Sequence, residues 1–111
     1  MNSDGHDSED PRELFRRYPG NPIITAQHLP RMGNAVFNAA ATEFKGETLL
    51  LLRVEDRTGL SHLAVATSAN GRDRWVIDRD RRMLPHTDCY EEHWGIEDPR
   101  ITKVGDEWFI V

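Results

Sequence analysis

This sequence has little cysteine and no long apolar run. The first argues against a disulfide-bonded protein, and the second argues against a membrane-spanning one. The single cysteine, Cys89, has no partner for an internal disulfide, so the chain suits a reducing compartment. No stretch approaches the ~20 consecutive apolar residues that a membrane-spanning helix needs. The first ten residues carry neither a basic start nor an apolar run, unlike a signal peptide. We therefore predict a cytoplasmic protein without a membrane partner.

Positive charge is also in short supply. Lysine and arginine total 14 residues against 19 aspartates and glutamates, and the net charge is -5. Such a field repels phosphate backbones, which argues against nucleic acid as a partner. The one locally basic run, 78–82, interleaves acids with bases and predicts a solvated loop. His86, Cys89 and His93 offer too few ligands for a closed zinc site, so we expect no metal.

Helical periodicity is absent as well, and the remaining pattern predicts an all-β fold. Residues 1–13 are acidic and polar and predict a disordered tail. Residues 14–35 hold Pro19-Gly20-Asn21-Pro22 and predict an extended segment, from which Ile23 and Ile24 dock on a larger body. Beyond it, apolar segments separated by turn residues predict strands at 36–44, 48–54, 62–68, 74–78, 98–104 and 107–111.

The strand pattern repeats along the chain. Aligning Gly46 with Gly105 superimposes two strand–turn–strand units, and two further strands lie between them. Four antiparallel strands followed by a restart are typical of a β-propeller blade, here 36–78, with the first half of the next blade at 98–111. The last strand stops in mid-run at Val111, so we expect an N-terminal piece of a larger propeller that is inactive alone.

Two polar segments are candidates for a site. Asn38 and Glu97-Asp98 stand at matching points of the strands that line a propeller channel, so we expect them at one pocket mouth. Pro99 favours an extended Asp98, and strand alternation then sends one acid into the pocket while the other acid braces it through Arg100. The alternative is a plain turn before a strand.

Arg53 ends an apolar strand, where an unpaired charge is costly. It either clamps a substrate hydroxyl or the Asp98 carboxylate, or it forms a structural salt bridge with Glu55 or Glu97.

Four blocks together resemble a known family. They are Asn21-Pro22-Ile23-Ile24, Val36-Phe37-Asn38, Arg53-Val54-Glu55-Asp56 and Gly95-Ile96-Glu97-Asp98-Pro99-Arg100-Ile101-Thr102. In this order they resemble the start of glycoside hydrolase family 130, the β-mannoside phosphorylases and related hydrolases, over residues 17–111. The resemblance implies a five-bladed β-propeller in the full protein. It also implies that Asp98 is the general acid and that Asn38 and Arg53 hold the sugar.

The expected reaction is inverting cleavage of a β-mannosidic bond in an oligosaccharide. Phosphorolysis needs one catalytic carboxyl, Asp98, because phosphate is already a nucleophile; hydrolysis needs a second carboxylate across the sugar. Asp98 must carry a proton, which we expect burial near the channel to favour. We expect Asn38, Arg53, Glu97 and Arg100 to bind the substrate. Inorganic phosphate is the expected co-substrate, with no other cofactor. An inverting β-mannosidase, a non-catalytic sugar-binding propeller and a homo-oligomeric full-length form stay open.

Overall fold

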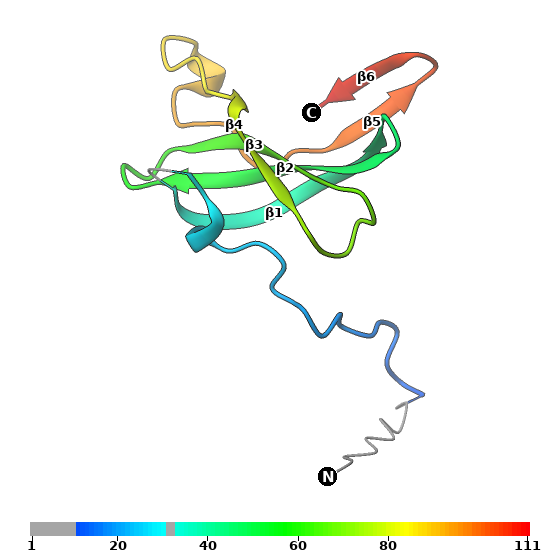
Figure 1. The fold of residues 1–111 in the computed structure, drawn as a ribbon. Helices are drawn as coiled ribbons and strands as arrows, with labels where there is room; N and C mark the ends of the chain where they lie inside the picture. The colour runs from blue at the N-terminus through cyan, green and yellow to red at the C-terminus, as the bar shows by residue number, and fades with distance from the viewer. Residues whose placement is uncertain (1–10, 31–32) are drawn as a thin grey trace.

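The computed structural model describes residues 11–30 and 33–111, and within them the fold is all-β, as predicted. A four-stranded antiparallel sheet has the order β1-β2-β3-β4, and β5 and β6 form a separate two-stranded sheet (Figure 1). The only helices in these ranges are single 3-10 turns, η1 (Ala26–His28) and η2 (Tyr90–Glu92), and neither could span a membrane. The strands are β1 (Gly33–Phe44), β2 (Glu47–Asp56), β3 (Ser61–Ser68), β4 (Val76–Met83), β5 (Ile101–Val104) and β6 (Glu107–Ile110).

All six strands differ from their predicted ranges by at least one residue, and the largest differences are in β4 and at the starts of β1 and β5. β4 ends at Met83 and takes in the charged run 78–82, which was predicted as a loop, because its pairing with β3 reaches Leu63↔Met83. An outermost strand with exposed charged side chains is protected against edge-to-edge association. β5 begins at Ile101 rather than at residue 98. The disordered tail predicted at 1–13 lies mainly outside the described residues, and the predicted domain boundaries stay predictions.

The core explains the unbroken apolar run of β2. Leu52 and Val54 are buried on one face together with Ala64 and Ala66 of β3, while Leu51 is buried on the opposite face. Because neighbouring residues of a strand point to opposite faces, the centre of β2 is buried on both sides, as the missing alternation predicted. Side chains from outside β2 and β3 pack on the first face: Ile24, Leu29, Val36, Trp75 and Ile77.

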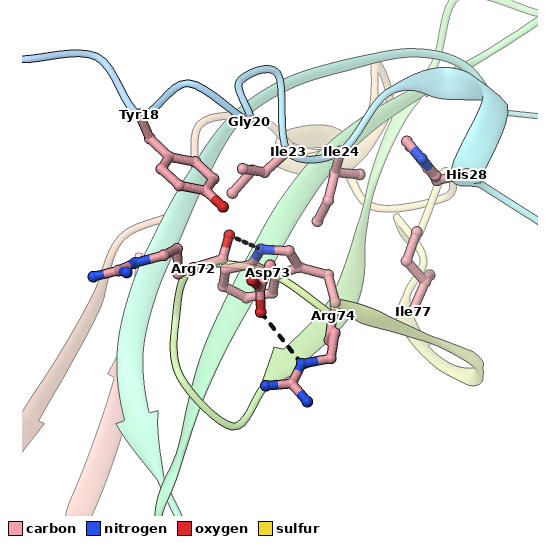
Figure 2. Close-up of a pocket in the computed structure, with 10 residues that line it drawn as sticks. Tyr18, Gly20, Ile23, Ile24, His28, Arg72, Asp73, Arg74 and Ile77 are labelled. Atoms are coloured by element: carbon pink, nitrogen blue, oxygen red, sulfur yellow. Dashed lines mark hydrogen bonds and ion pairs between the residues drawn. The ribbon is translucent and has the colours of Figure 1, made fainter. Parts of the chain in front are cut away.

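The N-terminal segment docks on this first face and leaves a hollow beside it. Ile24 packs against the core cluster, as expected. In Figure 2, Tyr18 and Ile23 lie on one side of the hollow and the 72–74 loop lies on the other. Its volume is about 400 Å³, and none of the predicted site residues lines it.

Two hairpins carry the repeat seen in the sequence. The β1–β2 turn is Lys45-Gly46, with φ of 51° and 77°, and the β5–β6 turn places Gly105 at φ 61°. Positive φ at these positions matches the right-handed twist of the strands. The hairpins meet through the rings of Phe44 and Trp108, edge to face at 5.8 Å. Both hairpins therefore have two-residue turns, but Gly46 is the second residue of its turn and Gly105 the first, so the structural repeat is offset by one residue from the glycine alignment.

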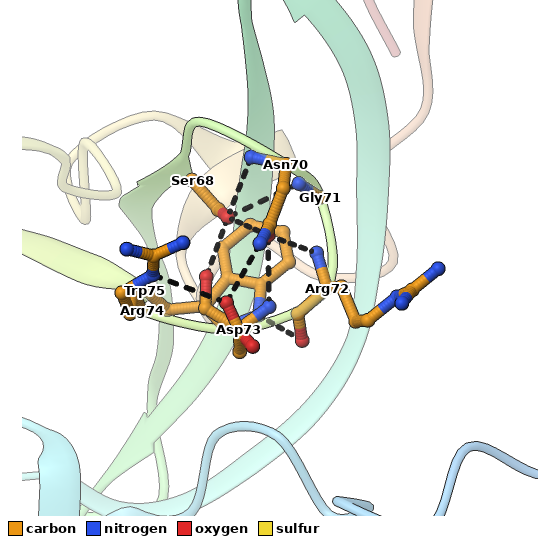
Figure 3. Close-up of polar contacts among 7 residues, drawn as sticks. All are labelled: Ser68, Asn70, Gly71, Arg72, Asp73, Arg74 and Trp75. Atoms are coloured by element: carbon orange, nitrogen blue, oxygen red, sulfur yellow. Dashed lines mark hydrogen bonds and ion pairs between the residues drawn. The ribbon is translucent and has the colours of Figure 1, made fainter.

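The loop from β3 to β4 is organised by a buried serine. Ser68, only 3% exposed, donates its hydroxyl to the Asp73 carbonyl at 2.6 Å and accepts the amide of Gly71 at 3.1 Å (Figure 3). The Asn70 amide also bonds the Asp73 carboxylate at 2.7 Å, which lowers the Asp73 pKa. These bonds fix the loop that leads to Trp75, whose ring packs on the core.

The β2–β3 turn is held by Asp56, and we predict a pH-dependent contribution to stability. The Asp56 carboxylate accepts the Thr58 hydroxyl and the amides of Thr58 and Leu60, and the Thr58 hydroxyl bond is the main cause of its lowered pKa. A carboxylate whose pKa is lowered in the folded state stabilises the fold at any pH above its ordinary pKa of about 3.9. This stabilisation is lost as the pH falls through the folded-state pKa. Asp56→Ala should therefore lower Tm at neutral pH, with the deficit shrinking below pH ~4.

Thermal unfolding followed by circular dichroism between pH 7 and 2.5 measures this effect. Asp106→Ala is the control, since Asp106 is likewise an aspartate where two paired strands are connected, but it makes no side-chain hydrogen bond within the described residues. An Asp56→Ala deficit that is constant over the whole pH range would contradict the prediction.

Candidate functional site

A β-bulge in the neighbouring strand β1 lies directly opposite Arg53. Val36 pairs with Val54 and Ala39 with Leu52, so Phe37 and Asn38 together face Arg53. Two residues opposite one define a β-bulge, a device that re-aims side chains and often lies beside functional sites. The bulge directs the aromatic ring of Phe37 to the guanidinium, whose carbon lies 4.6 Å from the ring centre.

The guanidinium of Arg53 joins two carboxylates and a hydroxyl. Nη1 lies 3.0 Å from Asp98 Oδ1, Nη2 lies 3.1 Å from Glu97 Oε1, and Nε donates to Ser61 Oγ at 3.1 Å. The Arg53 side chain is 17% exposed, whereas those of Glu97 and Asp98 are 51% and 64% exposed. A mostly buried cation thus presents two accessible carboxylates to solvent. Asp98 and Glu97, which were expected as alternative partners of Arg53, both contact it.

The local conformation of the two acids differs from the prediction. Asp98 has φ 48°, in the left-handed region, and not the extended geometry expected before Pro99. β5 starts only at Ile101, so strand alternation does not apply to residues 97 and 98, and both carboxylates reach the same guanidinium. Aspartate tolerates this backbone region better than most residues. The expected burial of Asp98 is also not found in the described residues.

Arg100 does not link Glu97 to Asp98 within the described residues. Its backbone pairs with Val111 through two hydrogen bonds, at 2.8 and 2.9 Å, and its side chain has no ion pair within the described ranges. Arg53 takes that place, because the turn at Asp98 brings Glu97 back toward β2. Arg100 as a substrate-binding residue stays a prediction.

Gly95 places the acidic segment next to Arg53. It forms a parallel bridge with Ser61 at the start of β3, and the Ile96 amide donates to the Ser61 carbonyl at 3.0 Å. Gly95 has φ 103°, and a Cβ there would lie 2.8 Å from the Ser61 nitrogen and 2.9 Å from its oxygen. Both the backbone angle and the close approach require glycine.

We predict that Gly95→Ala destabilises the fold by more than its backbone strain alone. Positive φ in alanine costs about 1–3 kcal/mol, and the clash with the Ser61 backbone adds to it. Gly59→Ala is the matched control, because Gly59 has φ 87° and no atom lies within 4 Å of the position that a Cβ would take there. Urea unfolding of both variants measures the difference. Equal losses of stability would show that the close approach at Gly95 contributes nothing.

The site holds two residues, Phe37 and Ser61, to which the sequence assigned no role. Phe37 carried a weak signal, as the one aromatic residue beside Asn38 in a run of small side chains, but Ser61 carried none. Asn38 itself is exposed, and its side-chain amide makes no hydrogen bond to any described residue, so it is available to a ligand. Sugar binding by Asn38 stays a prediction.

The histidine and cysteine loop has local contacts of its own. The Cys89 thiol donates to Glu91 at 3.0 Å, which lowers the Glu91 pKa, and His93 Nδ1 lies 2.9 Å from the Thr87 carbonyl. Among the described residues, no group of three or more histidine, cysteine or carboxylate side chains is arranged to hold a metal ion.

The fold and this cluster together define an all-β protein of blade-like sheets with an arginine–carboxylate site where β2 and β3 meet the segment before β5. The family model described as β-1,4-mannooligosaccharide phosphorylase, glycoside hydrolase family 130, matches residues 7–111. The chain belongs to this family, as the four sequence blocks predicted, and the β-propeller is the fold of the family.

Two curated relatives agree with the family match. The chain is 30% identical over 108 residues to a β-1,4-mannooligosaccharide phosphorylase of Ruminococcus albus, covering 91% of this chain and 32% of the relative. It is 33% identical over 101 residues to a 4-O-β-D-mannosyl-D-glucose phosphorylase of Bacteroides fragilis, covering 86% of this chain and 24% of the relative. The chain thus spans about a quarter to a third of the curated relatives that it matches.

Proposed function

We propose that this chain supplies the acid side of an active site that cleaves β-mannosidic bonds by phosphorolysis, with inversion. The observation that carries the proposal is the Arg53 guanidinium holding Asp98 and Glu97 at accessible positions beside Asn38. The printed names of both relatives, each a phosphorylase of a mannose-containing sugar, support the reaction class.

In the proposed reaction, Asp98 gives a proton to a sugar hydroxyl, which passes its own proton to the oxygen that leaves the mannose. A phosphate oxygen attacks the anomeric carbon from the opposite face; that bond forms as the glycosidic bond breaks. The products are mannose 1-phosphate and a sugar with a new hydroxyl group. Arg53 has five N–H donors and uses three on Ser61, Asp98 and Glu97, which leaves two for substrate oxygens. The exposed amide of Asn38 can bind another sugar hydroxyl.

Glu97 is not placed to act as the base that hydrolysis would need. A hydrolase of this stereochemistry needs a base across the sugar ring, with the two carboxyl groups about 6.5–9.5 Å apart. Glu97 shares one guanidinium with Asp98, on the same side of the site, so it does not serve as that base. Phosphate needs cationic groups to hold it and no base. An inverting β-mannosidase remains the second candidate, with its base supplied from outside residues 97 and 98.

Cleavage of β-1,4-mannobiose with and without inorganic phosphate tests the proposal. The longest polypeptide that can be obtained with this sequence is the right sample, because the relatives are three to four times as long as the part matched. Mannose 1-phosphate that forms only with phosphate supports phosphorolysis. Free mannose without phosphate supports the hydrolase. Saturable mannobiose binding without any product would identify a sugar-binding propeller and overturn the catalytic proposal.

A further inference from the structure

We infer that Ser61 is a positioning residue that sets the orientation of the Arg53 guanidinium, and through it the placement of Asp98. This inference rests on the proposed function only where turnover is the readout. Ser61 lies at the first position of β3 and is 1% exposed, among the most buried side chains described. A buried hydroxyl needs a hydrogen-bond partner, and the partner here is Arg53 Nε at 3.1 Å.

Ser61 touches both halves of the site at once. Its side chain accepts from Arg53 on β2, while its backbone bridges Gly95 and accepts the Ile96 amide at 3.0 Å. Glu97 and Asp98 follow directly along that chain. Ser61 therefore positions both groups relative to each other. Its side chain holds the Arg53 guanidinium, and its backbone holds the segment that carries the two carboxylates.

The bond to Nε matters because a guanidinium is a rigid planar fork. With Nε held by Ser61, the two terminal nitrogens point at Asp98 and Glu97, and the face of the fork lies over Phe37. Without the Ser61 hydroxyl, the ion pairs to two half-exposed carboxylates remain, but the plane of the fork is free to turn. The two N–H groups left for substrate would then lose their direction.

Ser61→Ala tests this role, with Ser68→Ala as its matched control. Both serines lie on β3, both are nearly fully buried, and the Ser68 hydroxyl bonds only to the loop 70–73. In the longest obtainable polypeptide, we expect Ser61→Ala to lower kcat by about 10- to 100-fold, as small misplacements of catalytic groups do. KM should change by less than about threefold, and Ser61→Thr should restore much of kcat. Ser68→Ala should lower Tm and leave kcat unchanged.

A double-mutant cycle separates positioning from a general loss of stability. Lysine has no counterpart of Nε, so Ser61→Ala should have no further effect on kcat in an Arg53→Lys background. Independent, multiplying effects of the two substitutions would overturn the inference. So would equal losses of kcat in Ser61→Ala and Ser68→Ala.

A measurement without turnover keeps the inference testable if the proposed function is wrong. The Nε–H proton of Arg53 should exchange slowly with solvent in the parent protein, because it is bonded to a buried oxygen. By NMR, Ser61→Ala should accelerate that exchange at least tenfold, and Ser68→Ala should not. A parent that cleaves no mannoside would refute the proposed function. Unchanged exchange in Ser61→Ala would refute the positioning role, whatever the function is.

Discussion

Replacing Asp98 by asparagine should reduce the phosphate-dependent cleavage of mannobiose by about 10²- to 10⁴-fold in kcat, the usual contribution of a general acid. Asparagine keeps the shape of the side chain, and its amide oxygen can still accept from Arg53 Nη1, which now lies 3.0 Å from the carboxylate. It cannot release a proton to the sugar hydroxyl. The contact with Arg53 that the substitution weakens is largely exposed at Asp98, so stability should change by less than about 1 kcal/mol.

Glu97→Gln is the informative control for this prediction. It makes the same chemical change on the other carboxylate of the same guanidinium, at 3.1 Å from Nη2. If Asp98 is the proton donor, Glu97→Gln should lower kcat far less than Asp98→Asn does, by about tenfold or less. Equal losses would mean that both acids act only by holding Arg53, and the assignment of the acid would fail. Initial rates with saturating phosphate and mannobiose measure both variants.

Much of the fold follows from local signals in the sequence. The unbroken apolar run of β2 and the turn residues around Gly46 and Gly105 predicted strands that the structure contains. The charged run 78–82 was misread because its composition is that of a loop. Its place as the outermost strand depends on pairing with β3, which composition does not record. Charged residues are common on edge strands, where strand propensity depends on the neighbouring strand more than on composition.

The sequence was enough to predict which residues form the site, but not how their side chains are arranged. Arg53 at the end of an apolar strand signalled a paired charge, and its partners Glu97 and Asp98 were among those named. Their shared orientation was not foreseen, because it depends on a left-handed Asp98 in a segment docked through Gly95. Ser61 left no trace in the sequence. A serine that begins a strand is common, and only the fold brings it to Arg53.

Arg53→Lys should be the second most damaging substitution, lowering kcat/KM by about 10²- to 10³-fold although the charge is kept. Lysine carries one ammonium group in place of the planar fork, so it cannot contact Ser61, Asp98 and Glu97 together or stack its head flat on Phe37. Since Arg53 is mostly buried, the lost contacts should also destabilise the fold by about 1–3 kcal/mol.

Arg57→Lys serves as the control for Arg53→Lys, because Arg57 is exposed in the turn after β2 and has no ion pair within the described residues. It should leave both kcat/KM and Tm as they are. The two variants together separate the charge of an arginine from its shape. If lysine at position 53 supports full activity, a positive charge near Asp98 is enough, and the bonds to Ser61 and Glu97 are not needed for the reaction. A different result would be that Arg53→Lys lowers kcat/KM and that adding Asp98→Asn to Arg53→Lys lowers it little further. The Arg53 guanidinium would then act through Asp98, as their contact at 3.0 Å implies.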